Sequence, residues 1–456
     1  MNYSNFKSQY YAFLLVFITA GILGSPIIAD SETQPQDLFS LSLDELMNVE
    51  AVITTAGKQA EKVKDIPASV VIITRNEIEN FGYKTIQEIL QSVPGLYMVD
   101  DYYWRGSENF GVRGFFSTGP FNDLIILING VNQVEDINSS YPFNKINVPV
   151  EAIDRIEVVR GPMSVIYGSG AFFGAINIIT NETSKETKPN LLGSSYGSNH
   201  NARLTYRHSS YTENGFLTMN VSGFHDRGVD NPYTDMMTNG PDILLSAGLP
   251  EDLTAKNNLS SNNKYAGVAG KYNSFNFDFS FNRTEMGTID GRITSSKEQK
   301  CITQSSILAL GFDKEISDVV SVSNRFAYQE YNYEINYDYI SDNGLSRGDE
   351  GSNAFEIESD IFIKPNNWFN STFGFYLRNI ADSKAEANII DLVSITLGMD
   401  PNSNCYAKAA FAQFGVSLME NFSIIAGGRF EHRSGFTSEI ILYKPLDNLN
   451  SKIQPH

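Results

Sequence analysis

The sequence predicts a small α/β domain followed by an up-and-down antiparallel β-barrel of the kind that spans membranes. Three observations support this prediction. From about residue 190, apolar and polar residues alternate in segments of roughly ten residues. The connections between these segments are alternately short and long, and 12% of all residues are aromatic. Aromatic residues favour strands and gather in belts at both membrane interfaces.

Composition limits the classes of function. The 456 residues exceed the needs of one ordinary domain, so at least two structural units are expected. The formal net charge of −19 argues against nucleic acid as a partner, because phosphate binding needs clustered Lys and Arg. The same charge argues against docking on an acidic membrane surface.

The N-terminus carries an apolar run, residues 12–24, behind the single Lys7. This run is shorter than the roughly 20 residues of a membrane-spanning helix and has the length of a secretory h-region. The small Ala29 precedes an acidic segment that begins at Asp30. We therefore expect a signal peptide at 1–29 and a mature chain that begins near Asp30, with an uncleaved anchor or a buried helix as the alternative.

Residues 30–56 form an N-terminal extension, and residues 57–187 read as the small α/β domain. Thr85 is placed to cap a short helix that Pro94 and Gly95 stop. Asn129 and Gly130 stand between apolar flanks, which is the strongest hairpin signal in the chain. The expected elements are strands at 70–74, 124–131, 153–159 and 175–180, and helices at 75–81 and 85–92.

Residues 188–456 read as about eleven strands of a barrel wall. In the run that begins at Phe275, every second residue is Phe, with Asn276, Asp278 and Ser280 on the other face. We expect the apolar face to meet lipid and the polar face to line the lumen. The same pattern appears at 331–339 and 410–418. Long external loops are expected near 227–262, 286–301, 340–352 and 381–404, with short turns at the opposite end.

Three blocks of the small domain resemble the plug domain of TonB-dependent outer-membrane receptors. They are Gly-Val-Arg-Gly at 111–114, LIILINGV at 124–131 and AIDRIEVVRGPMSVIYGSGAFFGAINIIT at 152–180. The sequence departs from the family pattern at Asn129, where Asp is more frequent, and at Phe173, where one of a Gly pair is common. The resemblance implies that the plug sits in the lumen of a barrel of about twenty-two strands. Since about half of these are found, the barrel is expected to be incomplete and unable to assemble alone.

The resemblance also implies a function. Members of the family import a scarce ligand, such as a ferric siderophore or a similar chelate, across the outer membrane of Gram-negative bacteria. The implied partners are TonB with its inner-membrane motor complex, outer-membrane lipid and the small-molecule ligand; no cofactor and no enzymatic reaction are implied. Two alternatives remain open: a ligand-sensing or docking receptor without transport, and a non-functional truncated fragment.

The extended segment 49–55 resembles the TonB box, which family members hand to TonB as an added β-strand. Main-chain pairing does not require particular side chains. The assignment therefore depends mainly on the position of the segment between the signal peptide and the plug. The expected TonB-binding residues are Val49, Glu50, Ala51, Val52, Ile53, Thr54 and Thr55.

By the same resemblance, Arg113 and Arg160 are expected at the plug surface as ionic locks against barrel carboxylates. A buried guanidinium needs a carboxylate or a comparable partner in either case. The alternative is that each arginine pairs within the plug, for instance Arg160 with Glu157. The family's partners for these arginines would lie in later strands.

Aromatic plug segments are expected to rise toward the outer mouth, where aromatic surfaces suit chelates and macrocycles. Packing of the same side chains against the barrel wall is the alternative. The candidate ligand-binding residues are Tyr102, Tyr103, Trp104, Arg105 and Phe116.

No catalytic or metal site is expected. The segment 193–197 fits G-x-S-x-G, but a nucleophile elbow needs a strand, a turn and a helix, and only strand follows. The five His show no metal-ligand spacing. Cys301 and Cys405 are expected four inter-strand steps apart, roughly 19 Å at ~4.8 Å per step. A disulfide needs Cα atoms within about 7 Å, which favours two free thiols and leaves the bridge open.

Overall fold

A computed structural model describes the part of the chain listed at the end of this paragraph. All of these residues belong to Glu50–His456, the second of two units into which the chain divides. The expected signal peptide lies outside them. The described residues are 52–55, 57–58, 61–62, 66, 68–99, 109–116, 123–134, 136, 141, 143, 145–180, 189–236, 242, 244–245, 250–255, 259–287, 299–337, 346–389, 393–399, 405–419, 422–434 and 438–443.

The small domain, called the plug below, is built on a mixed five-stranded sheet with the order β3-β9-β10-β7-β8. All neighbours are antiparallel except β10 and β7. The sheet strands are β3 Ser69–Thr74, β7 Leu124–Ile128, β8 Val131–Asn132, β9 Ile153–Arg160 and β10 Gly174–Thr180. The other plug elements are β1 Val52–Ile53, β2 Glu61–Lys62, α3 Arg75–Phe81, α4 Ile86–Gln91, β4 Leu96–Val99, β5 Asn109–Val112, β6 Phe115–Phe116, η3 Val150–Ala152 and α5 Ser164–Tyr167.

Local sequence explains where the plug elements begin and end. Thr74 caps α3 in a capping box with Glu77, and Gly82 ends that helix in the left-handed conformation at φ 69°. Thr85 caps α4, as its position in the sequence indicates. Asn129 and Gly130 have φ of 49° and 79° between β7 and β8, which is the geometry of a tight hairpin turn.

The plug core lies between its central sheet and helices α3 and α4. All five residues of β7 and all seven of β10 are buried, as is expected of strands covered on both faces. Ile89 and Leu90 of α4 are fully buried in the same cluster. The core is continued by four side chains of the large sheet, Tyr265, Ile307, Ala309 and Ala327.

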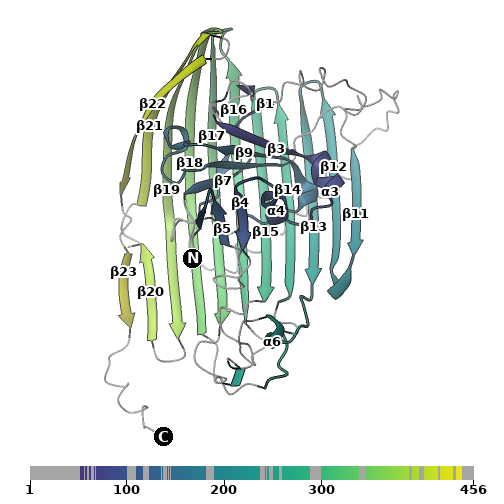
Figure 1. Ribbon diagram of the computed structural model, residues 1–456. Coiled ribbons are helices and arrows are strands. Elements are labelled where there is room, and N and C mark those ends of the chain that lie inside the picture. The colour runs from purple at the N-terminus through teal and green to yellow at the C-terminus, as the bar shows by residue number, and fades with distance from the viewer. Residues whose placement is uncertain are drawn as a thin grey trace. The chain divides into compact units, whose positions relative to one another are not determined.

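The large sheet, called the wall below, contains thirteen strands in the part of the chain that the structure describes. It starts at β11 and runs in sequence order through antiparallel neighbours, and Figure 1 shows its long strands beside one another. The wall strands are β11 Asn190–Tyr196, β12 Ala202–Thr212, β13 Gly215–Asp226, β14 Ser261–Tyr272, β15 Phe275–Gly287, β16 Lys300–Glu315, β17 Val320–Tyr337, β18 Ser346–Asn366, β19 Phe369–Ile389, β20 Val393–Met399, β21 Cys405–Met419, β22 Phe422–Ser434 and β23 Ser438–Tyr443. The short helices η4 Ser198–His200 and α6 Tyr233–Met236 lie in the connections.

Beyond β19 the wall divides into two levels. The first half of β19 pairs with β21, which pairs with β22, whereas the second half pairs with β20, which pairs with β23. A line across the sheet at either level therefore crosses eleven strands. The prediction of a long loop at 381–404 is wrong in part, because β19 reaches Ile389 and β20 follows it. Alternation of apolar and polar residues continues in sequence through 393–397, which explains the extra strand.

The two faces of the wall differ in polarity. Large apolar side chains such as Leu204, Phe277 and Phe375 are exposed on the outer face. Polar side chains such as Asn220, Ser280 and Thr303 are buried on the inner face. This inverse pattern is that of a sheet with lipid on one side and a filled lumen on the other.

At the loop end of β17 the predicted orientation is wrong. Tyr331, Tyr333 and Ile335 are buried and form a cluster with Cys301. Tyr331 pairs with Ser305, whose hydroxyl donates to a plug carbonyl, so this aromatic face points inward. The residues that alternate with them, including Glu330 and Glu334, are polar. This end of β17 therefore lies beyond the apolar band, and alternation alone does not say which face meets lipid.

Two further findings concern the described residues. Cys301 and Cys405 are both buried, in β16 and β21. None of the described helices has the length and hydropathy of a membrane span.

Candidate functional site

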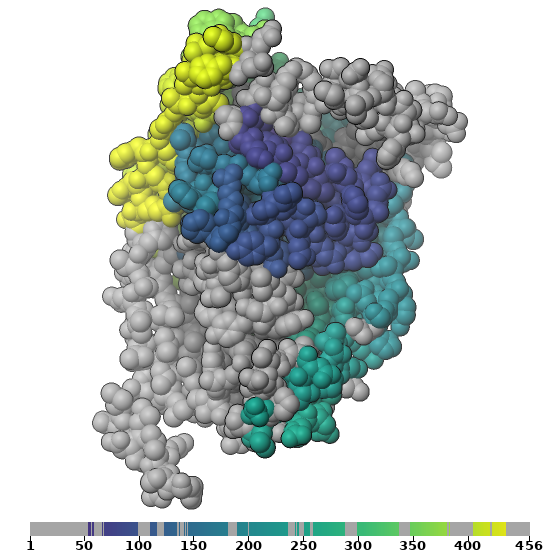
Figure 2. Space-filling view, viewed as in Figure 1, coloured from purple at the N-terminus to yellow at the C-terminus, as the bar shows by residue number. Residues whose placement is uncertain are grey.

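The candidate site is the surface where the plug meets the inner face of the wall. Figure 2 shows the plug as a compact body with β22 on one side and β12 and β13 on the other. Contacts exist on both sides. Arg203 of β12 lies 3.1 Å from the Glu151 carboxylate, and Arg429 of β22 donates to the Ile166 carbonyl at 3.2 Å. Wall strands far apart in the sequence thus hold one plug.

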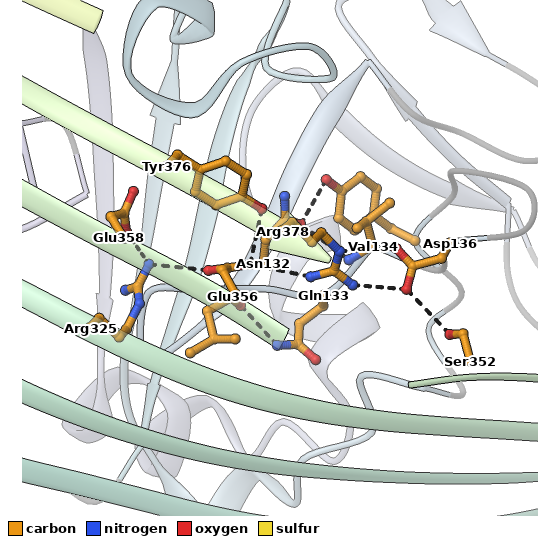
Figure 3. Close-up of polar contacts among 12 residues, drawn as sticks. Asn132, Gln133, Val134, Asp136, Arg325, Ser352, Glu356, Glu358, Tyr376 and Arg378 are labelled. Atoms are coloured by element: carbon orange, nitrogen blue, oxygen red, sulfur yellow. Dashed lines mark hydrogen bonds and ion pairs between the residues drawn. The ribbon is translucent and has the colours of Figure 1, made fainter. Parts of the chain in front are cut away.

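A buried ion-pair network occupies the centre of this surface (Figure 3). Arg378 of β19 holds Asp136 of the plug through two bonds, Nε to Oδ1 at 3.0 Å and Nη2 to Oδ2 at 2.9 Å. Its third nitrogen, Nη1, donates to Glu356 of β18 at 3.2 Å. Ser352 and Tyr376 donate their hydroxyls to Asp136 and Glu356. A bidentate guanidinium–carboxylate pair of this kind fixes position as well as charge.

The network continues along the wall toward the N-terminal segment of the plug. Arg325 of β17 bridges Glu356, at 3.5 Å, and Glu358. Glu358 in turn meets the ammonium group of Lys58, which lies above the rings of Tyr167 and Phe411. Removing one member of such a buried network leaves its partner charge uncompensated, which costs about 3–5 kcal/mol.

Asn129 at the plug hairpin makes a second contact with the wall. Its amide nitrogen donates to Asp278 of β15 at 2.7 Å and to the Thr180 hydroxyl at 2.9 Å. Its amide oxygen accepts from the Thr180 backbone at 2.8 Å. An Asp at position 129 would face the Asp278 carboxylate, so the departure from the family pattern at this position matches the wall residue opposite.

The turn after α5 approaches β22 closely. Gly168 has φ 84°, and a Cβ at this position would lie 2.6 Å from a Glu431 oxygen and 3.0 Å from Arg429 Nε. Glu431 is itself held by Arg429 and Arg433, and Arg433 also donates to Ser169. The backbone conformation therefore favours glycine here, and a larger residue would also have to displace the ends of the Glu431 and Arg429 side chains.

The predicted TonB box is described from Val52 onward, and Val49, Glu50 and Ala51 lie outside the described residues. β1 forms a two-stranded ladder with β2, and Ile53 is fully buried against Ile66 and Val159. The backbone nitrogens of Thr54 and Thr55 both donate to Glu157. This part of the segment is thus packed on the plug.

Arg113 and Arg160 both bond within the plug. Arg160 donates to the Pro94 carbonyl and to the Ser69 hydroxyl, and Arg113 donates to the Arg160 carbonyl at 3.1 Å. In the arginine contacts between plug and wall given above, the arginine belongs to the wall and the acceptor to the plug. A role of Arg113 and Arg160 as ionic locks against barrel carboxylates stays a prediction.

The candidate ligand-binding residues are largely beyond the described part of the chain. Tyr102, Tyr103, Trp104 and Arg105 lie outside it, and Phe116 is described for its backbone, which pairs with Gly111. Their role stays a prediction. Among the described residues, no group of His, Cys, Asp and Glu has the arrangement of a metal site.

Sequence reasoning missed the residues that join plug and wall, chief among them Asp136, Arg378 and Arg203. A signal existed for the wall carboxylates, because Glu356, Glu358 and Asp360 occupy every second position of one strand. Charges at this spacing share the lumen face, where a plug must neutralise them. The identity of the partners was not readable, since Asp136 and Arg378 are 242 positions apart.

Comparison with known proteins agrees with this architecture. Residues 62–175 match the family described as TonB-dependent Receptor Plug Domain. The vitamin B12 transporter BtuB of Vibrio vulnificus is 26% identical over 50% of this chain and 36% of its own length. The iron-regulated outer membrane virulence protein of Vibrio cholerae is 34% identical over 31% of this chain and 22% of its own length. The chain thus matches little more than a third of these relatives' length.

Solved structures share the fold. The ferric yersiniabactin uptake receptor FyuA of Yersinia pestis superposes with a TM-score of 0.63 at 16% identity. The match covers 82% of this chain and 60% of FyuA. At this level of identity, the likeness concerns the arrangement of plug and wall.

Proposed function

Because the chain belongs to the TonB-dependent receptors of the Gram-negative outer membrane, we propose that it serves energy-coupled uptake of a scarce ligand. The ligand class is a ferric siderophore or a similar chelate. The relatives are receptors and transporters rather than enzymes, and this chain is assigned no reaction.

The observation that carries the proposal is the polar character of the plug–wall contact. Arg378, Asn129 and Arg203 join the two parts through charged and amide groups. These contacts lie beside the small apolar patch, including Ile307 and Ala327, that continues the plug core into the wall. Buried ion pairs contribute little net stability but specify position strongly. A plug held in this way has one resting position, and leaving it exposes a small apolar patch and not the whole core, which is what a gated import path requires.

The proposal gives each part of the chain a role. Residues 1–29 direct export, TonB grips 49–55 as an added strand, residues 57–187 form the plug, and residues 188–456 contribute to the barrel. The inner-membrane motor supplies energy through TonB, and lipid covers the outer face. Ligand binds above the plug at Tyr102, Tyr103, Trp104, Arg105 and Phe116, while Arg113 and Arg160 stabilise the resting plug.

The experiment compares Ile53→Pro with Ile53→Ala in the receptor expressed in outer membranes. Proline removes a backbone donor and interrupts the strand offered to TonB. Alanine removes the same buried side chain but keeps the donor, so it is the matched control. Uptake and surface binding of radiolabelled iron are measured for a ferric hydroxamate and a ferric catecholate.

We expect Ile53→Pro to abolish energised uptake and to leave surface binding intact, with Ile53→Ala retaining uptake. Collapse of the proton gradient should stop uptake by the unmodified receptor. Uptake that continues without the gradient, or that Ile53→Pro does not change, would contradict coupling through this segment.

A further inference from the structure

One plug carboxylate binds the backbone of the N-terminal segment. Glu157 of β9 is fully buried, and its Oε2 accepts from the nitrogens of Thr54 and Thr55, each at 3.0 Å. The Thr55 hydroxyl donates to the same oxygen at 2.5 Å. The other oxygen, Oε1, accepts from Arg155 Nε at 2.9 Å. Charge-assisted bonds of this kind are roughly twice as strong as neutral ones.

Other backbone groups of the segment are also engaged. The Tyr167 hydroxyl donates to the Thr55 carbonyl at 2.7 Å. Burial raises the pKa of Tyr167, so the phenol keeps its proton and remains a donor. On the N-terminal side, Val52 and Ile53 pair with Lys62 and Glu61 of β2.

These contacts matter because strand addition uses the same groups. A partner that adds a β-strand binds through main-chain N–H and C=O groups. At Thr55 both groups are taken, the nitrogen by Glu157 and the carbonyl by Tyr167. The segment therefore cannot pair with a partner along its whole length while it stays on the plug.

We propose that Glu157 is a latch, a positioning residue that withholds the backbone of Thr54 and Thr55 from a partner strand until the segment leaves the plug. This inference rests on the proposed function, because it concerns access of TonB to the same segment. Tyr167 assists Glu157 by donating its hydroxyl to the Thr55 carbonyl. Opening exchanges five hydrogen bonds for bonds to water. It also withdraws Ile53 from the small cluster with Ile66 and Val159, which is separate from the main plug core, so the core itself need not unfold.

The test measures exposure of the segment in purified receptor in detergent, without TonB. Thr54→Cys is the reporter, because it keeps the backbone nitrogen and loses only a 3.5 Å side-chain contact. The rate of reaction with a bulky maleimide is compared in the parent, Glu157→Gln and Tyr167→Phe. Glu77→Gln is the matched control, since Glu77 also accepts from a threonine nitrogen and hydroxyl, but in the exposed capping box of α3.

We expect Glu157→Gln to raise the labelling rate of Cys at position 54 about tenfold, or about 1.4 kcal/mol in opening free energy. Tyr167→Phe should raise it less, and Glu77→Gln should not change it. Thr55→Val removes one of the bonds to Glu157 and should raise the rate in the parent. In the Glu157→Gln background it should add little, because both changes break the same contact.

An unchanged rate in Glu157→Gln would overturn the latch. So would a parallel rise in the reactivity of Cys301 and Cys405, which are buried in the wall and would report general loosening. Binding of the periplasmic domain of TonB is measured separately on the same variants. Faster labelling without TonB binding to any variant would overturn the coupling to TonB and leave the contact between Glu157 and the segment established.

Discussion

The plug and the wall contain similar residues but bury and expose their apolar side chains in opposite ways. In the plug, β7 and β10 are buried completely. In the wall, Leu204 and Phe277 are exposed on the outside, while Asn220 and Thr303 are buried inside. The plug is organised around an apolar centre in water, whereas the wall has its apolar surface outward and its polar surface against the plug.

This inversion determines how the two regions meet. The polar inner face of the wall meets the polar periphery of the plug, and only a small apolar patch, including Ile307 and Ala327, joins their cores. Specific charges therefore position the plug, with the wall supplying Arg203 and Arg378 to Glu151 and Asp136. A domain held by matched charges is well positioned and yet separable, and its separation exposes that small apolar patch and not the whole core.

The substitution expected to have the largest effect on plug docking is Arg378→Met, which removes the arginine that both Asp136 and Glu356 bind. Two carboxylates would remain buried, and we expect plug docking to weaken by about 3–5 kcal/mol. Protease sensitivity of the plug as a function of denaturant measures the effect. The matched control is Arg347→Met in the neighbouring strand β18, where Arg347 is exposed and pairs with Asp349. That change should cost less than about 1 kcal/mol.

Adding Asp136→Leu to Arg378→Met should restore part of the loss, because one unpaired charge disappears. If both single changes cost as little as Arg347→Met, charges do not position the plug, and the apolar patch carries the interface instead.

The outer face of the wall is tested with Leu308→Arg on β16. Leu308 is exposed on the side that meets lipid, so an arginine there should cost about 2–4 kcal/mol at mid-membrane depth and less near an interface. Leu308→Met is the control and should be nearly neutral. Heat-modifiable mobility of the assembled protein in gels reports the folded fraction. Equal assembly of both variants would show that this face does not meet lipid.

The sequence predicted the elements of both regions because each element depends on local pattern. Thr85 marks a helix start, Asn129 and Gly130 mark a hairpin, and alternation of apolar residues marks the wall strands. These signals need no knowledge of distant residues. The fold class, a small α/β plug with an antiparallel wall of the membrane-barrel type, followed from them and from the resemblance.

Two kinds of feature were not predictable from local pattern. The orientation of Tyr331 and its neighbours depends on where the apolar band ends along β17, which alternation does not encode. The partners of Asp136 and Glu157 depend on which segments lie opposite them in the fold. The sequence alone does not indicate whether a charged residue contacts water or another charged or polar group of the protein. Resemblance directed attention to Arg113 and Arg160, while the described contacts to the wall lie elsewhere.

A smaller effect is expected from Asn129→Asp at the plug hairpin. The change replaces the donor to Asp278 by a second carboxylate, and we expect docking to weaken by about 1–3 kcal/mol. Lowering the pH should reduce the penalty, because protonating either carboxyl removes the repulsion and restores a donor. The double variant Asn129→Asp/Asp278→Asn should recover most of the loss, and protease sensitivity is the measurement. If the Asn129→Asp variant is as stable as the parent, the contact between position 129 and Asp278 does not contribute to plug docking.

The smallest effect is expected from Thr74→Ala, which acts inside the plug alone. Thr74 accepts from the Glu77 nitrogen at 3.3 Å, and loss of a cap of this kind costs about 1 kcal/mol. The change touches no wall residue in the contacts described, so the denaturant midpoint of the plug should fall while heat-modifiable mobility of the wall stays constant. Thr74→Ser keeps the hydroxyl and should behave like the parent. If Thr74→Ala instead lowers the stability of plug and wall together, the two regions unfold as one cooperative unit, and the contact between them is stronger than matched charges alone would make it.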